Sequence, residues 1–155
     1  MKPTISERVA LPKGYRFEII HGMFDSEHDG TRGCLDNTVD VRLWYKQKCI
    51  GHVELAADYR RDKRNKLSYT THSYLAPLYR NKGLGARMYA RAIIWCLARK
   101  YKVHSYHHPS SDAQRVWRSR YLTSKFMMYL RPKDSDDYGR GYGPAWNAEL
   151  KNKRK

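Results

Sequence analysis

Two glycines stand at the start of the clearest helical pattern in this sequence, where backbone groups can bind a phosphate. Gly83 and Gly85 flank Leu84, the first residue of the pattern, and Arg80 and Lys82 lie beside them. Glycines let backbone N–H groups approach an anion closely, and a helix N-terminus adds partial positive charge. A tight turn would need the same glycines, so the pair alone is a weak signal. A Walker A loop is excluded because no Gly-Lys-Ser/Thr follows, and a Rossmann fingerprint because it needs a third glycine.

The elements that would position this loop follow from hydrophobic periodicity. An apolar line predicts a helix over Leu84–Lys100, and a second helix opens at Pro109, with Ser111 and Gln114 spaced as a capping box. Several strands followed by helix, strand, helix and strand predict an α+β fold, a mixed sheet with helices packed on it. Alternation and β-branched or aromatic runs predict the strands 15–20, 38–45, 49–55, 67–75, 103–106 and 126–130.

Two segments lack such patterns. Residues 59–66 are too highly charged to be buried, so we expect an exposed loop there. From residue 132 onward the chain is rich in Gly, Tyr, Asp and Lys, which predicts an irregular segment. We therefore expect a single domain over residues 1–131 and a basic, Gly- and Tyr-rich C-terminal extension over 132–155.

The segment from Tyr74 to Gly85 resembles motif A of the GNAT acetyltransferases, in which a strand ending near a proline leads into R/Q-x-x-G-x-G/A. The resemblance covers about residues 38–130. It implies a mostly antiparallel, twisted sheet with helices on its faces, acetyl-CoA as the cofactor, and an N-acyltransferase reaction. The implied cofactor residues are Leu75 and Ala76 for the pantetheine arm, and Arg80, Asn81, Lys82, Gly83, Leu84, Gly85 and Ala86 for the pyrophosphate.

The implied reaction needs a base for the amine and an acid for the leaving thiolate. Glu54 is our first choice for the base and His72 the second, although either can be an ordinary strand residue facing solvent. The tyrosine that serves as the acid in the family is replaced here by Trp117, which cannot donate a proton, and Tyr121 lies one turn later. The acid is then Tyr121, Tyr106, a histidine or water, unless the chain has lost turnover.

Charge is the unusual feature of the composition: 31 Lys and Arg against 15 Asp and Glu, a formal net charge of +16. Residues 1–55 carry 8 basic and 8 acidic side chains, whereas residues 56–100 carry 11 against 2 and residues 101–155 carry 12 against 5. Such one-sided charge favours a polyanionic partner, either nucleic acid, a ribonucleoprotein or an acidic protein face. The residues expected to contact it are Arg60, Arg61, Lys63, Arg64, Lys66, Arg115, Arg118 and Lys125.

Three functions stay open at this point. The first is an acetyltransferase for an acceptor within nucleic acid or bound to it. The second is an acetyltransferase for a small amine or an acidic protein; a polycationic amine is disfavoured because the basic surface would repel it. The third is a catalytically inactive GNAT-fold protein that binds nucleic acid or protein.

Cellular location and metal content follow from simpler counts. No apolar run is long enough to cross a membrane, and the N-terminus lacks the apolar block of a signal peptide. The three cysteines are widely spaced, which indicates reduced thiols, so we expect a cytoplasmic protein. His104, His107 and His108 have no Cys, Asp or Glu at matching ligand spacing, so no metal is expected.

Overall fold

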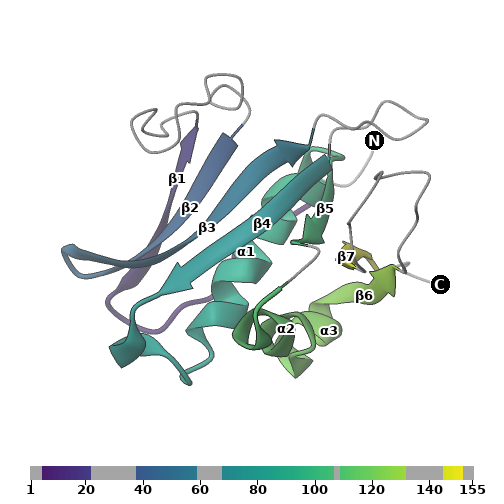
Figure 1. Ribbon diagram of the computed structural model, residues 1–155. Coiled ribbons are helices and arrows are strands. Elements are labelled where there is room, and N and C mark those ends of the chain that lie inside the picture. Colours follow the sequence, from purple (N-terminus) through teal and green to yellow (C-terminus); the bar gives the residue numbers. More distant parts are fainter. Residues whose placement is uncertain (1–4, 22–37, 59–67, 107–108, 132–144, 152–155) are drawn as a thin grey trace, which may run out of the picture.

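The computed structural model describes residues 5–21, 38–58, 68–106, 109–131 and 145–151, which build one seven-stranded sheet with helices (Figure 1). The strand order is β1-β2-β3-β4-β5-β7-β6, and every neighbouring pair is antiparallel except β4–β5. The expected α+β class is therefore confirmed. The strands are β1 (Tyr15–His21), β2 (Thr38–Tyr45), β3 (Lys48–Asp58), β4 (Ser68–Leu75), β5 (Lys102–Ser105), β6 (Phe126–Arg131) and β7 (Ala145–Leu150), and the helices are η2 (Pro77–Tyr79), α1 (Leu84–Ala98), α2 (Ser111–Trp117) and α3 (Arg120–Lys125).

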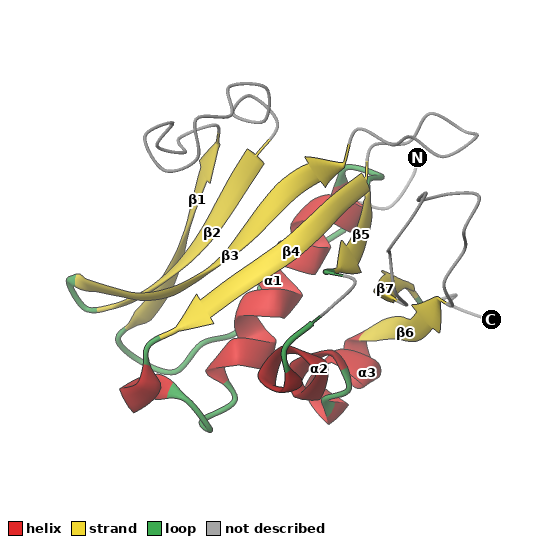
Figure 2. Ribbon diagram, viewed as in Figure 1, coloured by secondary structure: helices red, strands yellow, loops and turns green. Residues whose placement is uncertain are grey.

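Helix α1 packs against one face of the sheet and encloses the core (Figure 2). On β2, Val39, Val41 and Leu43 belong to the apolar core at every second position, as the alternating pattern predicts, although Thr38 and Asp40 are buried too. Ala90 and Ile93 of α1 are fully buried in the same apolar cluster. Burying these side chains supplies most of the driving force that fixes α1 on the sheet.

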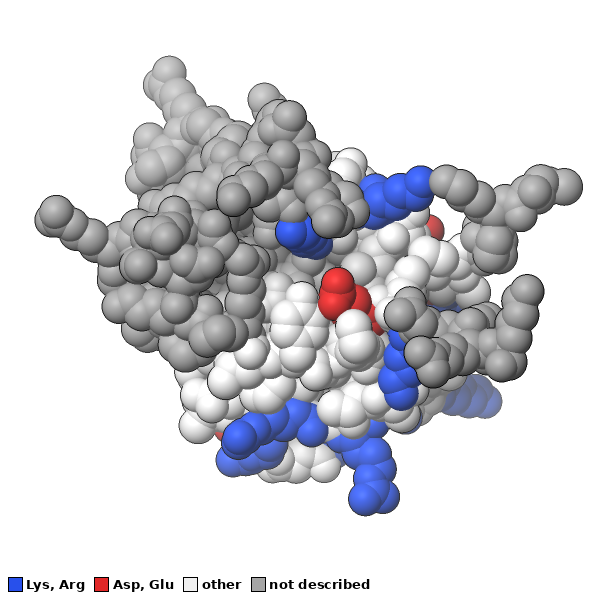
Figure 3. Space-filling model, turned by 90° about the vertical axis from the view of Figure 1, so that its right-hand side faces the viewer, with Lys and Arg blue, Asp and Glu red and all other residues white. Residues whose placement is uncertain are grey.

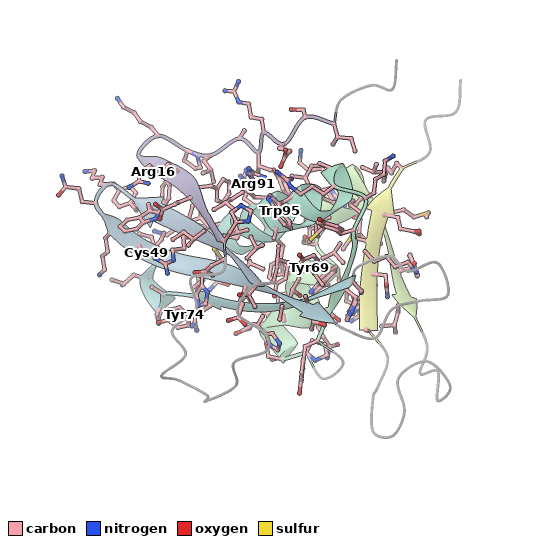
Figure 4. The ribbon with its side chains drawn as sticks, turned by 90° about the horizontal axis from the view of Figure 1, so that it is seen from above. Arg16, Cys49, Tyr69, Tyr74, Arg91 and Trp95 are labelled. Atoms are coloured by element: carbon pink, nitrogen blue, oxygen red, sulfur yellow. The ribbon has the colours of Figure 1, made fainter. Side chains whose placement is uncertain are left out.

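The C-terminal half of α1 is fixed to the beginning of β4 and to the N-terminal segment. Tyr69 of β4 and Trp95 of α1 meet edge to face between sheet and helix, with ring centroids 5.8 Å apart (Figure 4). Glu7 accepts hydrogen bonds from Arg91 at 3.3 Å and from Arg99 at 2.8 Å. Because α1 runs back along β4, these contacts place the N-terminus of α1 beside the end of β4.

Strands β4 and β5 separate halfway along β4, which opens the sheet. They pair in parallel only over Ser68–Thr71 and Lys102–Ser105. Strand β4 continues to Leu75, whereas the chain leaves β5 after Ser105. Within the described residues, positions 72–75 of β4 thus have no strand partner on that side, and the opening faces α1 and α2 (Figure 1).

The expectation of an irregular extension after residue 131 is wrong for residues 145–150. These residues form β7, which pairs along the whole of β6 and lies between β6 and β5. The link to β5 is the pairing of Asn147 with His104, together with a 2.9 Å hydrogen bond from the Trp146 N–H to Ser105 Oγ. The polar Asn147 at its centre weakens the strand pattern of the sequence, so pairing with the neighbouring strands determines that these residues form a strand.

The second helix differs from its prediction in two ways. It is divided into α2 and α3, because Ser119 caps a new helix by accepting a hydrogen bond from the Leu122 N–H at 3.3 Å. The cap of α2 is Ser110 and not the expected Ser111, since Ser110 Oγ accepts from the Ala113 N–H at 3.1 Å. Ser110 has the extended backbone that an N-cap needs, whereas Ser111 is already helical.

This cap predicts a clear difference between two neighbouring serines. Ser110→Ala is expected to lower the free energy of unfolding by about 1 kcal/mol, because the Ala113 N–H loses its acceptor. Ser111→Ala is expected to change it by less than about 0.5 kcal/mol, as an exposed helical position does. Urea denaturation of the two variants measures both values, and an equal or larger loss for Ser111→Ala would contradict the assignment.

Candidate active site

The loop between β4 and α1 ends at a glycine in the left-handed region. Gly83 is the N-cap of α1 with φ 78°, a conformation that favours glycine, and no side chain caps this helix end. Asn81 is also left-handed, with φ 63°. The first backbone N–H groups of a helix have no partner within the helix, so this end of α1 is suited to bind an anion.

A cleft of about 550 Å³ runs from this loop along the open edge of β4. Ser73–Leu75 of β4 form one side, the first turns of α1 the base, and α2 the other side. Of the expected cofactor residues, those that line this cleft are Leu75, Arg80, Asn81, Gly83, Gly85 and Ala86. Ala76 and Lys82 are not among its lining residues, and the Leu84 side chain is buried in the core.

Some backbone groups at the end of β4 already have partners inside the protein. The Leu75 carbonyl accepts a hydrogen bond from Arg80 Nε at 2.7 Å, and the Ala76 N–H donates to the Ile50 carbonyl at 2.8 Å. Arg87 donates to the Gly83 carbonyl at 3.0 Å. Two arginines therefore brace the two ends of the loop.

A second cavity of about 210 Å³ continues the cleft toward β5. The two cavities share the lining residues Ser73, Tyr89, Ser110 and Ala113. Only the smaller cavity is lined by Thr71, His72, Ser105, Tyr106, Pro109 and Trp117. The site therefore extends from the glycine loop to a region that holds groups able to exchange protons.

Tyr89 lies where the two cavities meet. Its side chain is buried, and its hydroxyl is hydrogen-bonded to the Ser73 hydroxyl at 2.7 Å. Burial raises the pKa of the Tyr89 phenol above its ordinary value, and the hydrogen bond to Ser73 opposes this effect. The phenol is therefore protonated at neutral pH. Tyr89 is not among the site residues expected from the sequence, because it lies in a helix whose pattern indicates only packing.

Trp117, at the end of α2, is fully buried beside Tyr89. The two rings meet edge to face at a centroid distance of 5.5 Å. Among the described residues the indole N–H of Trp117 has no hydrogen-bond partner, although it lies near enough to the Tyr89 hydroxyl to favour the ionised phenol. A buried donor without a partner lowers the stability of a protein, so this N–H beside a cavity calls for a functional explanation.

The two candidate bases are direct neighbours across β3 and β4. Glu54 and His72 are register partners, so their side chains extend from the same face of the sheet. His72 lines the smaller cavity, and its ring centroid lies 5.0 Å from that of Tyr106. Glu54 is not among the residues that line either cavity.

The candidate acid Tyr121 lies on α3 and lines neither of the two cavities. The guanidinium of Arg87 is 4.9 Å from its ring centroid, and Lys125 Nζ is 5.1 Å from it. Its role as an acid stays a prediction.

A polar cluster on β2 and β3 was not expected from the sequence. Asp40, buried in the sheet face, accepts hydrogen bonds from His52 Nδ1 at 2.9 Å and from Arg42 Nε at 2.8 Å. Burial opposes ionisation of Asp40, but these two hydrogen bonds outweigh it and lower its pKa. The hydrogen bond to Asp40 raises the pKa of His52 against the effect of burial. The sequence alone does not reveal this cluster, because it depends on the register that places Arg42 opposite His52.

The raised pKa of His52 predicts how stability depends on pH. The contribution of the His52–Asp40 pair is complete below about pH 6.5, the ordinary value for histidine, and is lost as the pH rises through the raised value. As the pH rises from 6 to 9, the free energy of unfolding should therefore fall less in His52→Gln than in wild type. Urea denaturation across this range measures the difference, and parallel pH profiles for the two proteins would contradict it.

The basic residues expected to contact a polyanion are only partly described. Arg60, Arg61, Lys63, Arg64 and Lys66 lie outside the described residues. Arg115 lines the cleft and is exposed, Arg118 lies 5.8 Å from the ring centroid of Trp146, and Lys125 lies over Tyr121. On the face drawn in Figure 3, Lys and Arg side chains are separated by uncharged surface, and acidic atoms lie near its middle. The described part of this face therefore forms no single continuous basic stripe.

Within the described ranges, no helix is long and apolar enough to cross a membrane. The same ranges contain no cluster of three or more His, Cys, Asp or Glu side chains suited to hold a metal ion.

A seven-stranded sheet that opens beside a glycine loop defines a class of protein, and a family model identifies that class. The family model of the acetyltransferase (GNAT) family matches residues 11–120. The chain belongs to this family of acetyltransferases, and the resemblance inferred from the glycine loop is confirmed. No curated protein matches the sequence.

Two solved structures with a TM-score above 0.5 agree in fold. A GNAT family acetyltransferase from Elizabethkingia anophelis with acetyl-CoA bound has a TM-score of 0.54 and 12% identity, over 90% of this chain and 99% of that chain. NAA60 from Arabidopsis thaliana, in complex with a bisubstrate analogue, has a TM-score of 0.51 and 10% identity, over 89% and 99%. A GNAT family acetyltransferase from Streptococcus pneumoniae has a TM-score of 0.45 and 18% identity; 72% of this chain aligns with it but spans only 65% of its length.

Proposed function

We propose that this chain transfers the acetyl group of acetyl-CoA directly to the amine of an acceptor. The observation that carries the proposal is the continuous course of the two cavities from the uncapped start of α1 to His72. One end suits the phosphates of a cofactor, and the other holds groups able to accept and donate protons. Membership of the GNAT family and the acetyl-CoA bound to the Elizabethkingia anophelis relative support the same cofactor.

In this proposal each part of the cleft has a separate task. The loop from Arg80 to Ala86 binds the pyrophosphate through its backbone N–H groups. Leu75 lines the cleft and contacts the pantetheine arm, whereas Ala76 does not line it. When bound, acetyl-CoA supplies an acyl group activated by its thioester. The protein needs no covalent intermediate, because the amine can attack the acyl carbon directly.

The amine must lose a proton to attack. His72 lines the smaller cavity, and Glu54 lies opposite it on β3. These two residues are therefore the candidates for the general base. His72 takes the proton from the amine, and Glu54 either stabilises the resulting imidazolium or takes the proton in its place. Either assignment is possible because the two side chains extend from the same face of the sheet.

For the acceptor, we propose an amine of nucleic acid or of a protein bound to nucleic acid. The net charge of +16, concentrated after residue 55, supports a polyanionic partner. Exposed Arg115 lines the cleft, where it forms an ion pair with Asp112 at 3.8 Å. Aromatic residues among the basic ones add surfaces on which unpaired bases can stack.

This choice of acceptor predicts strong salt dependence. Binding of tRNA and of duplex DNA, measured by fluorescence anisotropy, should weaken by at least about 100-fold between 50 and 200 mM salt, as expected for roughly five or more phosphate contacts. Affinity that does not change with salt, or no binding at 50 mM, would favour a small amine or an acidic protein instead.

A second candidate function is a GNAT-fold binding module without turnover. The observation that favours it is Trp117, which has no ionisable group at the position of the tyrosine acid in the family. Calorimetric titration with acetyl-CoA, followed by an assay of thiol release with nucleic-acid, protein and small-amine acceptors, separates the two functions. Thiol release supports the enzyme; tight binding with no release above the uncatalysed rate supports the module.

A further inference from the structure

We propose that Tyr89 of α1 protonates the leaving sulfur of acetyl-CoA, and so performs the task that Trp117 cannot. This inference rests on the proposed acetyl transfer and adds to it the identity of the acid. It assigns a catalytic role to a residue of α1, the helix that follows the glycine loop, instead of to α2.

The Tyr89 hydroxyl lies where the sulfur of a bound cofactor is expected. A cofactor held at the glycine loop, with its acyl group presented to His72, must place its sulfur between these two ends. Tyr89 and Ser73 line both cavities and are hydrogen-bonded to each other at 2.7 Å where the cavities meet. The phenol thus lies at the junction that the thioester must occupy.

The groups around this hydroxyl are suited to stabilise its ionised form. The Ser73 hydroxyl, hydrogen-bonded to the Tyr89 hydroxyl at 2.7 Å, and the indole N–H of Trp117 both favour the ionised form of Tyr89. They can therefore stabilise the phenolate that remains after the proton has moved. The indole N–H has no hydrogen-bond partner among the described residues, and Trp117 lines the smaller cavity. Trp117 is in this account a positioning residue that acts through Tyr89.

The other candidate acids are placed less well. Tyr121 lines neither cavity and lies against Arg87 and Lys125. Tyr106 lines only the smaller cavity, where its ring lies 5.0 Å from His72 on the acceptor side. Of these three tyrosines, Tyr89 alone lines the junction.

The proton transfers balance without any further reactant. The amine nitrogen forms a bond to the acyl carbon, the carbon–sulfur bond breaks, and the sulfur takes the proton of the Tyr89 hydroxyl. The amine gives one proton to His72 or Glu54. That proton, or one exchanged with solvent, returns to the phenolate through the Ser73 hydroxyl, so the products are an amide and a thiol and the enzyme is restored.

A test that needs no acceptor compares the thiolate of CoA with a ligand that lacks sulfur. Wild type and Tyr89→Phe are titrated calorimetrically with CoA, desulfo-CoA and acetyl-CoA at pH 7 and pH 9.5, on either side of the ordinary thiol pKa of about 8.5. In wild type, the affinity for CoA relative to desulfo-CoA should rise by about 10-fold at the higher pH, because the thiolate accepts a hydrogen bond from the phenol. In Tyr89→Phe this rise should vanish, while acetyl-CoA affinity at pH 7 stays within about threefold.

The outcomes separate this inference from the proposed function. Suppose that all three ligands bind. If the affinity for CoA relative to desulfo-CoA then rises equally with pH in wild type and Tyr89→Phe, or does not rise in wild type, the role of Tyr89 is overturned and the acetyl-CoA site stays intact. No binding of any of them by folded wild type overturns the proposed function and this inference with it. Urea denaturation confirms that each variant is folded.

A second variant distinguishes a catalytic from a merely structural role. Trp117→Tyr in the Tyr89→Phe background returns a phenol to the position that the family uses. The double variant should recover part of the thiolate preference lost in Tyr89→Phe, which repair of packing alone would not produce. In wild type background, Trp117→Phe should reduce the thiolate preference by a few fold, since the phenol remains but loses one supporting donor.

Discussion

Gly85→Asp is expected to weaken acetyl-CoA binding by at least about 100-fold, whereas Gly85→Ala should change it by less than about threefold. Gly85 lines the cleft in the first turn of α1, where the proposed pyrophosphate site lies. A Cβ at this position would be 3.5 Å from Val116 Cγ2, an ordinary contact, so alanine fits. A carboxylate there would repel the phosphates by about 3–4 kcal/mol at 4–5 Å and an effective dielectric of 20.

The pair of variants separates binding from folding. An acidic side chain near a helix N-terminus usually stabilises the helix, so Gly85→Asp should fold at least as well as Gly85→Ala. Calorimetry with acetyl-CoA and urea denaturation of both variants test this directly. If Gly85→Asp binds acetyl-CoA as tightly as Gly85→Ala, the glycine loop is not the phosphate site.

His72→Gln and Glu54→Gln should each lower the turnover number by about 100-fold or more and leave the affinity for acetyl-CoA unchanged. A general base contributes about 10²–10⁴-fold to a rate. His72 lines the smaller cavity, and Glu54 is its register partner on β3. Neither lines the larger cavity, where the cofactor is proposed to bind. A larger loss for Glu54→Gln than for His72→Gln would make Glu54 the direct base.

His52→Gln is the matched control for this prediction. His52 lies on the same strand as Glu54 but is hydrogen-bonded to Asp40 and lines neither cavity. It should keep wild-type turnover at pH 7. Equal losses in His52→Gln and His72→Gln would indicate a general disturbance of the sheet and contradict a specific role for His72.

The elements with strong local patterns were predictable from the sequence. The predicted strand 38–45 is β2 with the same bounds, because alternating residues on it are buried against α1. The helix predicted over Leu84–Lys100 begins at the expected residue and ends two residues earlier, at Ala98. Strand β7 was not predictable, because its pairing with β5 and β6 depends on partners far away in the sequence.

The site was predictable only where one segment contains it. The glycine loop is a local motif, so its residues could be named from the sequence. The junction of the two cavities instead combines Ser73 of β4, Tyr89 of α1 and Trp117 of α2, which only the fold brings together. At helical spacing Tyr89 reads as a core residue, and its hydrogen bond to Ser73 depends on how β4 packs against α1.

Transfer of an isotope-labelled acetyl group shows directly whether the protein acetylates an amine. Wild-type protein is incubated with labelled acetyl-CoA and with tRNA, duplex DNA, a ribosomal protein or a small monoamine, and mass spectrometry locates the label. Label is expected in an amide on one of these acceptors, with one thiol released for each acetyl group transferred. Acetyl-CoA that folded protein binds but leaves intact, or only hydrolyses, with every acceptor would contradict it.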